Sequence, residues 1–463
     1  MAHGPVPGML SRAELGDLVE RGEIETVLAV FPDLYGRLMG KRITGPFFME
    51  HVADDGMHAC DYLLACDMEM DVIPGYRFAT WERGYGDMHC MPDFATLRRA
   101  TWLPKTALVL CDLASEPDHA PIEVAPRRML QRQVARAREL GLTVMAGSEI
   151  ELYLFNETYE SAAAKRFHDL QPIGAYNEDY HILQGTREEP LVGAIRRHLD
   201  ASGVPVEFSK GEAGLGQQEI NLRYCDVLAQ ADRNVIYKHA AKEIAHAQGK
   251  AVTFMAKWDE KHTGSSAHLH LSLWDASGER PLFPGDQQVG PVQASDTFRH
   301  FLGGWMRRAR EFSVCYAPYV ASYKRYQSRS WAPTGIAWSY DNRTAGFRVV
   351  GRGPSLRIEC RLPGADANPY IAYAAAIAAG LDGIINQVEP PPIFQGDIYA
   401  AAELPRVPST LRDAISEFER SDLAPEAFGA DVVEHYLHFL RTEQRKFDEV
   451  VTSWERARYF ERA

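Results

Sequence analysis

The chain lacks the cysteine patterns of a secreted disulfide framework or of a zinc ribbon. Its seven cysteines are odd in number and scattered, and none forms a Cys-x-x-Cys pair. Small secreted domains pair their cysteines, and zinc ribbons need closely spaced ones. The sequence therefore predicts a reduced, cytoplasmic protein. Residues 1–8 also lack the basic and apolar regions of a signal peptide, which agrees with this expectation.

Positive charge and long apolar runs are scarce as well. The 463 residues include 50 lysines and arginines against 63 aspartates and glutamates, which gives a formal net charge of −13. This balance argues against a nucleic-acid-binding surface. The longest apolar stretch, residues 371–381, is rich in alanine and too short to cross a bilayer. We therefore expect neither nucleic acid nor membrane as a partner.

The common nucleotide-binding motifs are missing too. The sequence contains no Walker A motif and no kinase glycine-rich loop. Gly351-Arg352-Gly353 is a weak glycine signal that indicates nothing by itself. A nucleotide site in this chain must therefore be of another type.

Length and periodicity predict an α+β protein with two domains, because 463 residues exceed one ordinary core. We expect a loose arm over residues 1–10, a small α+β domain over 11–115 and a larger domain over 116–463. Expected strands are 24–31, 37–43, 106–111, 143–155, 204–209, 218–224, 252–258 and 267–274. Expected helices are 11–22, 126–140, 190–202, 227–248, two that begin at 295 and 368, and most of the chain from 411 onward. Residues 155–189 and 387–408 are expected to be loops.

The sequence is unusually rich in charged or ligand-type residues that are two positions apart. Three clusters have this spacing, namely Glu149-Ile150-Glu151, His268-Leu269-His270 and Arg357-Ile358-Glu359-Cys360-Arg361. On a β-strand, residues at i and i+2 lie on the same face. A fourth cluster runs from Glu212 to Glu219. Together the four predict a cavity lined with carboxylate, imidazole and guanidinium groups.

Six of these residues have the chemistry of ligands for divalent metal ions. Mg²⁺ and Mn²⁺ prefer oxygen ligands, and Mn²⁺ also accepts imidazole. Crowded carboxylates repel one another unless cations lie between them. The alternative is that each glutamate is a solvated strand residue. This alternative explains any one glutamate well, but it explains the whole set poorly. Divided three and three between two ions, the candidates are Glu149, Glu151, Glu212, Glu219, His268 and Glu359.

Arginines gather in one stretch of the sequence close to these ligands. They are Arg325, Arg343, Arg348, Arg357 and Arg361. Guanidinium groups bind carboxylate and phosphate through paired hydrogen bonds. Beside a metal–carboxylate cluster they favour phosphoryl transfer from ATP to an acidic acceptor. For a single arginine, a surface ion pair is an equally good interpretation.

Several segments, in order and over almost the whole chain, resemble the glutamine synthetase family. Besides the clusters above they are Gly211-Glu212, Gly216-Gln217-Gln218-Glu219, Gly264-Ser265-Ser266-Ala267-His268, Ser322-Tyr323-Lys324-Arg325, Asn342-Arg343 and Ala367-Asn368-Pro369-Tyr370. The resemblance implies an N-terminal β-grasp domain and a catalytic domain with a curved antiparallel sheet. It also implies ATP as co-substrate, two or more Mg²⁺ or Mn²⁺ ions, and two stacked hexameric rings with active sites between neighbouring subunits.

The resemblance assigns roles to individual positions. Glu151, Glu212 and Glu219 resemble the ligands of the metal that faces glutamate, and Glu149, His268 and Glu359 those of the metal that faces the phosphates. Arg325, Arg361 and Gly264 match residues that bind glutamate. The family residues that bind the phosphates and the transferring phosphoryl group are matched by Arg343, Arg348 and Arg357. Residues that contact adenosine are matched by Glu207, Tyr224, His270 and Ser272.

The sequence departs from true glutamine synthetases at the ammonium site. Trp331 replaces the glutamate of the flap that closes over ammonium, six residues after the arginine of Ser322-Tyr323-Lys324-Arg325. Residues 71–84 lack the Phe-Asp-Gly-Ser-Ser motif whose aspartate binds and deprotonates ammonium. Thr263 replaces an asparagine before the substrate glycine, and Pro354 a lysine near the phosphates.

Intact phosphoryl-transfer residues beside an altered ammonium site resemble the γ-glutamylamine synthetases. These enzymes join glutamate to a primary amine of the polyamine or ethanolamine type through γ-glutamyl phosphate. Two alternatives stay open: a glutamine synthetase with an atypical ammonium site, and a non-catalytic structural or sensory relative. The surroundings of Tyr399 do not match those of the usual adenylylation tyrosine, so no regulatory role is assigned to it.

The sequence does not identify the amine or the residue that deprotonates it. Acidic residues at positions 67, 69, 71 and 82 would suit a polyamine or lie on the surface. Trp331 is expected to contact the substrate, since an indole ring packs against a methylene chain or an alkylammonium group. Glu82 is the candidate base.

Overall fold

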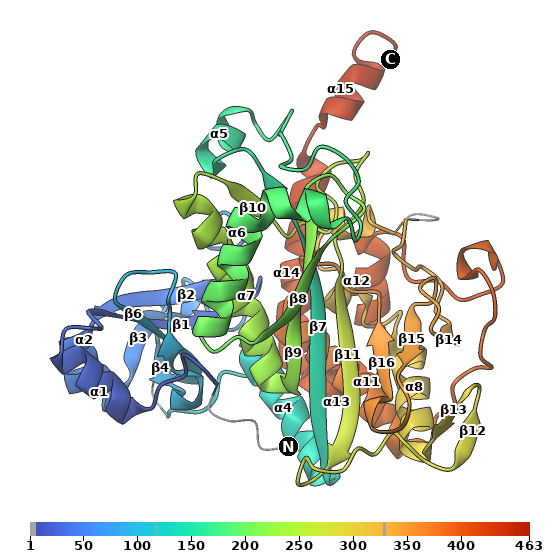
Figure 1. The fold of residues 1–463 in the computed structure, drawn as a ribbon, viewed down its shortest axis with the longest axis horizontal. Helices are drawn as coiled ribbons and strands as arrows, with labels where there is room; N and C mark the ends of the chain where they lie inside the picture. The colour runs from blue at the N-terminus through green and yellow to red at the C-terminus, as the bar shows by residue number, and fades with distance from the viewer. Residues whose placement is uncertain (1–5, 117, 327–329) are drawn as a thin grey trace.

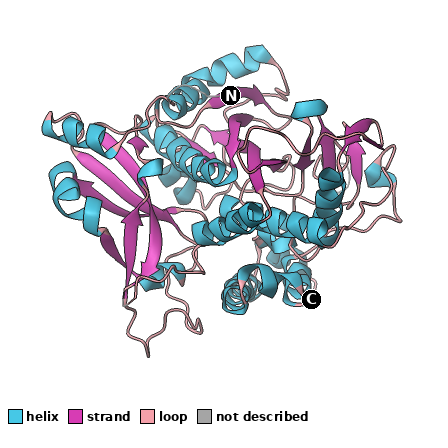
Figure 2. Ribbon diagram, turned by 90° about the horizontal axis from the view of Figure 1, so that it is seen from below, coloured by secondary structure: helices cyan, strands magenta, loops and turns pink. Residues whose placement is uncertain are grey.

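The structure is a computed structural model that describes residues 6–116, 118–326 and 330–463. Its strands form two sheets that lie side by side, and a separate hairpin of β12 (Gln287–Val289) and β13 (Val292–Ala294). Figure 2 shows the smaller sheet at one end of the molecule, with helices gathered around and below the larger one. The α+β class predicted from the sequence is confirmed.

The smaller sheet contains β1 to β6 and has the strand order β2-β1-β6-β4-β3, with β5 paired to β6. The bounds are β1 Thr26–Pro32, β2 Leu38–Thr44, β3 Met57–Cys60, β4 Asp87–Pro92, β5 Arg98–Arg99 and β6 Thr106–Ser115. Strands β1 and β6 run parallel, and the other pairs are antiparallel. Helix α1 (Arg12–Glu20) begins at Ser11 through the capping box formed with Glu14. The short α2 (Gly45–Phe47) and α3 (Ala53–Asp55) follow β2.

The larger sheet has the order β14-β15-β16-β11-β7-β9-β8, with β10 paired to β7. Its strands are β7 Leu142–Phe155, β8 Val206–Gly211, β9 Gln217–Asp226, β10 Ala251–Thr253, β11 Ala267–Asp275, β14 Trp338–Tyr340, β15 Phe347–Val350 and β16 Arg357–Cys360. All neighbours are antiparallel except β14 and β15. The antiparallel sheet implied by the family resemblance is thus present.

Helices cover one face of the larger sheet and thereby fix which side chains reach the other face. They include α4 (Pro126–Glu139), α7 (Val227–Ala247), α8 (Asp296–Arg308) and α11 (Pro369–Ile385). On β7, Ser148 Oγ donates to Asn234 Oδ1 of α7 at 2.8 Å, and Ile150 is fully buried. Because strand side chains alternate, Glu149 and Glu151 lie on the opposite face.

The remaining helices belong to the part of the chain that follows the smaller sheet. They are α5 Tyr159–Ala164, α6 Ile182–Ala201, α9 Ser313–Tyr316, α10 Val320–Tyr323, α12 Leu411–Glu419, α13 Leu423–Phe428, α14 Ala430–Glu449 and α15 Ser453–Tyr459. Helix α15 projects from the body of the molecule (Figure 1). Within the described residues, no helix is both long enough and apolar enough to span a bilayer.

Three sequence predictions need correction. The expected loop over residues 155–189 contains α5, which Thr158 caps, and the first part of α6. The helix expected to begin at Pro190 begins at Ile182, because tertiary contacts of the buried Glu188 outweigh the preference of proline for a first turn. The strand expected over 252–258 ends at Thr253, after which the Ala256 carbonyl accepts a hydrogen bond from Ser265 rather than from a sheet neighbour.

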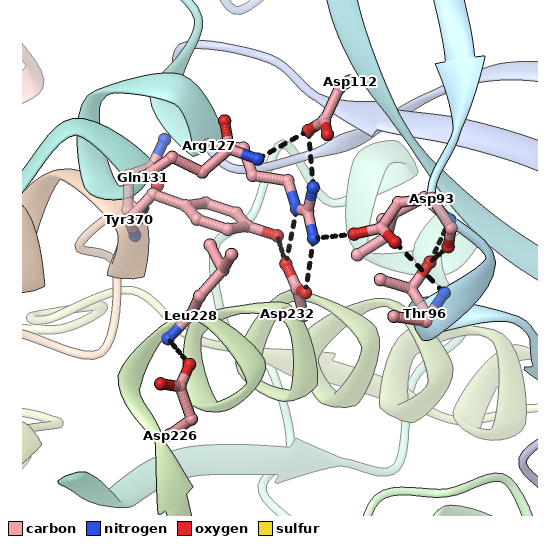
Figure 3. Close-up of polar contacts among 12 residues, drawn as sticks. Asp93, Thr96, Asp112, Arg127, Gln131, Asp226, Leu228, Asp232 and Tyr370 are labelled. Carbon is pink, nitrogen blue, oxygen red and sulfur yellow. Dashed lines mark hydrogen bonds and ion pairs between the residues drawn. The ribbon is translucent and has the colours of Figure 1, made fainter. Parts of the chain in front are cut away.

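A buried polar network joins the two sheets through α4 (Figure 3). The Arg127 guanidinium pairs with Asp112 of β6, with Asp93 at 2.7 Å and with Asp232 of α7 at 3.0 Å. Tyr370 at the start of α11 donates to the same Asp232 at 2.7 Å. The buried apolar side chains form one large cluster across both sheets. The boundary between residues 11–115 and 116–463 therefore stays a prediction.

Candidate active site

The predicted ligand residues lie in one row across the larger sheet. The backbone register pairs His270 with Glu359, His268 with Glu149, and Glu151 with Glu219. These residues come from four neighbouring strands, β16, β11, β7 and β9. Glu212 follows β8 at the edge of the row. The sheet therefore assembles the four sequence clusters on a single face.

Three overlapping groups in this row have the spacing of metal ligands. Glu151, Glu212 and Glu219 form one group, whose ligand atoms lie within 4.8 Å of one another. Glu149 belongs to two further groups, one with Glu219 and His268 and one with His270 and Glu359. The first group is the set that the resemblance implied for one metal ion. For the second ion, the structure brings His270 as well as His268 within reach.

His268 has the geometry and charge state of a ligand for the second ion. Its Nδ1 lies 3.0 Å from Glu149 Oε2 and 3.6 Å from Glu359 Oε1. Its Nε2 is buried and has no hydrogen-bond partner among the described residues. Burial, aided by the Arg361 charge, lowers the pKa of His268 to about 4, so the ring is neutral and able to bind a cation. His270 accepts a hydrogen bond at Nδ1 from Arg357 Nε at 3.2 Å, and its Nε2 lies 3.0 Å from Glu149 Oε1.

The electrostatics of the first group favour a bound cation. Burial and the nearby Glu212 carboxylate raise the pKa of Glu151 to about 8. Burial, with repulsion from Glu149 and Glu212, raises the pKa of Glu219 well above its ordinary value. Ionisation of all three carboxylates is unfavourable unless a positive charge lies among them. The group therefore fits a divalent ion.

Glu359 has the opposite environment, since two arginines neutralise it. It is fully buried, and it accepts from Arg361 Nη1 at 2.5 Å and from Arg348 Nη1 at 2.8 Å. Burial opposes ionisation, but the adjacent Arg361 charge lowers the pKa of Glu359 to about 2. Arg348 also donates to Asp341 at 2.6 Å. Glu359 is thus a permanent anion that holds two guanidinium groups at the site.

Two cavities adjoin along this row and share Glu149 and Asn221 in their walls. The first, of about 440 Å³, is lined by every residue that the resemblance placed near adenosine, Glu207, Tyr224, His270 and Ser272, and by Arg357. The second, of about 310 Å³, contains the first metal group together with His268, Arg343, Arg348, Arg361, Gly264 and Trp331. A nucleotide in the first cavity would direct its phosphates toward the second.

Arg325 occupies a different place from the one predicted. It is almost fully buried behind the wall of the second cavity, and its guanidinium donates to the carbonyl oxygens of Leu362 at 2.8 Å and Arg361 at 3.0 Å. It also donates to Ser266 Oγ at 2.7 Å. Direct contact of Arg325 with glutamate therefore stays a prediction. In this structure the residue positions Arg361.

Some residues of this cavity were not found by sequence reasoning. Asp179, Tyr180, Phe208 and Lys210 all line it. A signal existed for Lys210, which lies two residues before Glu212 in the β8 run. Asp179 and Tyr180 had none, because they belong to a turn whose place near the sheet no local sequence pattern indicates.

The other acidic residues considered from the sequence do not line this cavity within this chain. Glu82 is exposed beside the smaller sheet and does not line the cavity, so it is no candidate base in this subunit. Asp67 is buried and pairs with Lys446. Glu69 and Asp71 are exposed on the same segment. Tyr399 is half-buried, and burial raises its pKa to about 12.

The sequence matches the family described as glutamine synthetase, catalytic domain, over residues 123–459. The chain belongs to the glutamine synthetase family. One relative, the gamma-glutamylethanolamide synthetase GlnA4 of Streptomyces coelicolor, is 46% identical over 97% of this chain and 95% of its own. The glutamate–isopropylamine ligase of a Pseudomonas species is 34% identical over 96% and 97%. The glutamine synthetase of Thermotoga maritima is 30% identical over 96% and 98%.

Solved structures of the family share the whole fold. A GmaS structure without ligand superposes with a TM-score of 0.83 at 28% identity, over 97% of this chain and all of the other. A complex of GmaS with ADP gives a TM-score of 0.84 at 28% identity, over 96% and 99%. The family assignment therefore covers both sheets and is not confined to the catalytic segment.

Proposed function

We propose that this protein is an ATP-dependent ligase that joins the γ-carboxylate of L-glutamate to a primary amine. The observation that carries the proposal is the composition of the second cavity. It combines a carboxylate group suited to a divalent cation and three arginines with an uncharged indole, Trp331. The similarity to relatives named for an ethanolamide product and for an isopropylamine substrate supports the same reaction class.

The reaction has two steps that use different ends of the joined cavities. The glutamate γ-carboxylate attacks the terminal phosphorus of ATP, which gives γ-glutamyl phosphate and releases ADP. The neutral amine then attacks the acyl carbon, and phosphate leaves as the new nitrogen loses a proton. The first step brings two anions together and the second releases an anion, so positive charge near the transferring group lowers both barriers.

Two divalent ions, Mg²⁺ or Mn²⁺, complete the proposed site. Glu151, Glu212 and Glu219 would hold one ion. Glu149, His268 and Glu359 would hold the other. Such ions supply charge neutralisation and polarise the carboxyl and phosphoryl oxygens.

The protein's own cations act beside the ions. Arg343, Arg348 and Arg361 line the cavity, and the last two are fixed by Glu359, so their guanidinium groups are oriented before substrate arrives. In the proposal these groups bind the transferring phosphoryl group and the substrate carboxylate. Gly264 lines the cavity, and no side chain fits at this position because a Cβ atom would collide with Arg325 and the Ala256 carbonyl.

A phosphate-release assay tests the function. With saturating ATP and glutamate, a panel of primary amines should stimulate phosphate release well above the rate with ammonium, and mass spectrometry should detect the γ-glutamylamide. Efficient glutamine formation without stimulation by any amine would favour the second candidate, a glutamine synthetase with an atypical ammonium site. That candidate has support from the glutamine synthetases among the relatives. Absence of ATP turnover with every acceptor would favour the non-catalytic alternative.

Assembly into two stacked hexameric rings in a reduced cytoplasm also belongs to the proposal. It rests on the family resemblance and on seven cysteines that form no disulfide. Light scattering should give a mass near twelve subunits, and a monomer stable at assay concentration should be inactive if neighbours share each site. An active monomer would contradict the shared site.

A further inference from the structure

Lys210 places its own ammonium group in the second cavity, between two carboxylates. Its Nζ lies 3.1 Å from Asp179 Oδ1 and also pairs with Glu212. The same nitrogen lies 4.3 Å from the centre of the Tyr180 ring. The Lys210 side chain is only 14% exposed. An ammonium on the end of an alkyl chain is thus already seated beside the proposed reaction centre.

The turn that carries Asp179 and Tyr180 is held from behind by buried groups. Glu178 and Glu188 are almost fully buried, and Gln218 Nε2 donates to both, at 3.1 Å and 2.8 Å. The Tyr180 amide donates to the Gly211 carbonyl at 3.3 Å. Gly211 packs so closely against Glu178 that a Cβ atom there would lie 2.5 Å from the Glu178 carbonyl oxygen. The turn is therefore fixed against β8, which carries Lys210.

The charges of the cavity leave no carboxylate for a second substrate cation. Among the described lining residues, the acidic ones are Glu149, Glu151, Asp179, Glu212 and Glu219. All except Asp179 belong to groups suited to metal ligation. Asp179 is paired with Lys210. A cation bound at Glu212 would repel Lys210 and leave it to Asp179 and the Tyr180 ring.

We propose that Lys210 is a specificity-determining residue that restricts the acceptor to primary monoamines with an uncharged tail and excludes diamines and polyamines. The inference rests on the proposed function and narrows its substrate class. A diamine would bring a second ammonium group close to the Lys210 ammonium, and the two would repel each other. No unpaired carboxylate in the described cavity wall could offset the charge of the second ammonium. A monoamine meets no such repulsion once its reacting nitrogen is neutral.

The aromatic walls do not reverse this preference. Tyr180, Phe208 and Trp331 are about half exposed or more and line the same cavity. Aromatic faces contact methylene groups as well as ammonium groups. The Tyr180 face, however, already carries the Lys210 ammonium. The walls therefore suit an alkyl tail, and the fixed charge excludes a second cation.

Butylamine and 1,4-diaminobutane test the inference, because they have the same chain length and differ by one ammonium group. In the wild-type enzyme, with ATP, glutamate and Mg²⁺ saturating, kcat/KM for butylamine should exceed that for the diamine on the order of tenfold or more. Lys210→Met should bring the ratio close to one, since it removes the charge and keeps the chain. Lys210→Arg should retain the ratio. A surface control, Lys105→Met, removes a lysine that pairs with Glu25 outside the cavity and should change nothing.

Asp179→Asn separates charge from simple damage to the pocket. It removes the partner of Lys210 and keeps the lysine, so discrimination against the diamine should persist or increase. Because each ratio compares two amines on the same variant, loss of overall activity or of metal binding cancels. If Lys210→Met does not fold, the ratios of the wild type and of Asp179→Asn decide whether the cavity discriminates against the diamine.

The outcomes separate this inference from the proposed function. Failure of every amine to stimulate phosphate release would overturn the proposed function. Use of butylamine together with equal or better use of 1,4-diaminobutane by the wild type would overturn the inference alone. A ratio that Lys210→Met leaves unchanged would overturn the role of Lys210.

Discussion

The two ends of the reaction cavity are built in different ways. At the phosphate end, Glu149, His268 and Glu359 lie on paired strands whose register fixes their positions. At the amine end, Asp179, Tyr180 and Trp331 lie on turns, and Tyr180 and Trp331 have positive φ values of 57° and 60°. In the proposed site the residues of the chemistry lie on the sheet, whereas the residues of selectivity lie on loops, apart from Lys210 at the end of β8. Changes at the first end should therefore abolish the reaction, and changes at the second should redirect it.

The largest effect is expected at the phosphate end. Glu359→Ala removes a proposed metal ligand and leaves Arg348 and Arg361 without their shared anion, so kcat should fall about a thousandfold or more. EDTA should abolish ATP turnover in the wild type. Steady-state phosphate release measures both, with the exposed Glu260→Ala as control. Full activity in chelator would remove the metal site from the mechanism.

A large effect on stability rather than on chemistry is expected from the network between the sheets. Arg127→Met leaves Asp232 buried without its ionic partner, which should lower the free energy of unfolding by about 3–5 kcal/mol. Chemical denaturation measures the change. The ratio of butylamine to ammonium use should stay as in the wild type, because the network lies outside both cavities. A changed ratio would mean that selectivity depends on how the sheets are held together.

The strand-borne end could be predicted from the sequence, and the loop-borne end could not. Spacing at i and i+2 places Glu149 and Glu151 on one strand face, and this periodicity survives any tertiary context. The placement of Asp179 depends on the buried contacts of Glu178 with Gln218 and Gly211, which no local pattern encodes. The start of helix α6 could not be predicted for the same reason, since the buried Glu188 in its second turn is held by a tertiary contact with Gln218. Arg325 was identified by its motif, but its burial behind the cavity follows from packing.

The pH dependence of stability should show how crowded the carboxylates are without metal. Burial and the Glu212 carboxylate raise the pKa of Glu151 in the folded protein to about 8, above that of an unfolded glutamate. At a pH between these two pKa values, the folded protein therefore binds one more proton than the unfolded chain. Stability in EDTA should therefore fall as pH rises through 8, by about 1 kcal/mol per pH unit per proton. Thermal unfolding at pH 6 and pH 9 measures this fall. Mn²⁺ should stabilise more at pH 9, and Glu151→Gln should weaken the dependence.

The smallest effect is expected at Trp331, where the amine end replaces a carboxylate with an indole. The ring is 58% exposed and lines the cavity, and in the proposed function it would contact the amine through its face rather than through a charge. Such a contact contributes about 0.5–2 kcal/mol. Trp331→Glu should therefore shift the kcat/KM ratio of butylamine to ammonium toward ammonium by about tenfold, a change worth about 1.4 kcal/mol. Trp331→Phe keeps an aromatic face and should preserve most of the preference. If both variants reduce use of the two nucleophiles equally, Trp331 shapes the cavity without selecting the amine. Selectivity then lies with Lys210 and with the turn that carries Asp179 and Tyr180.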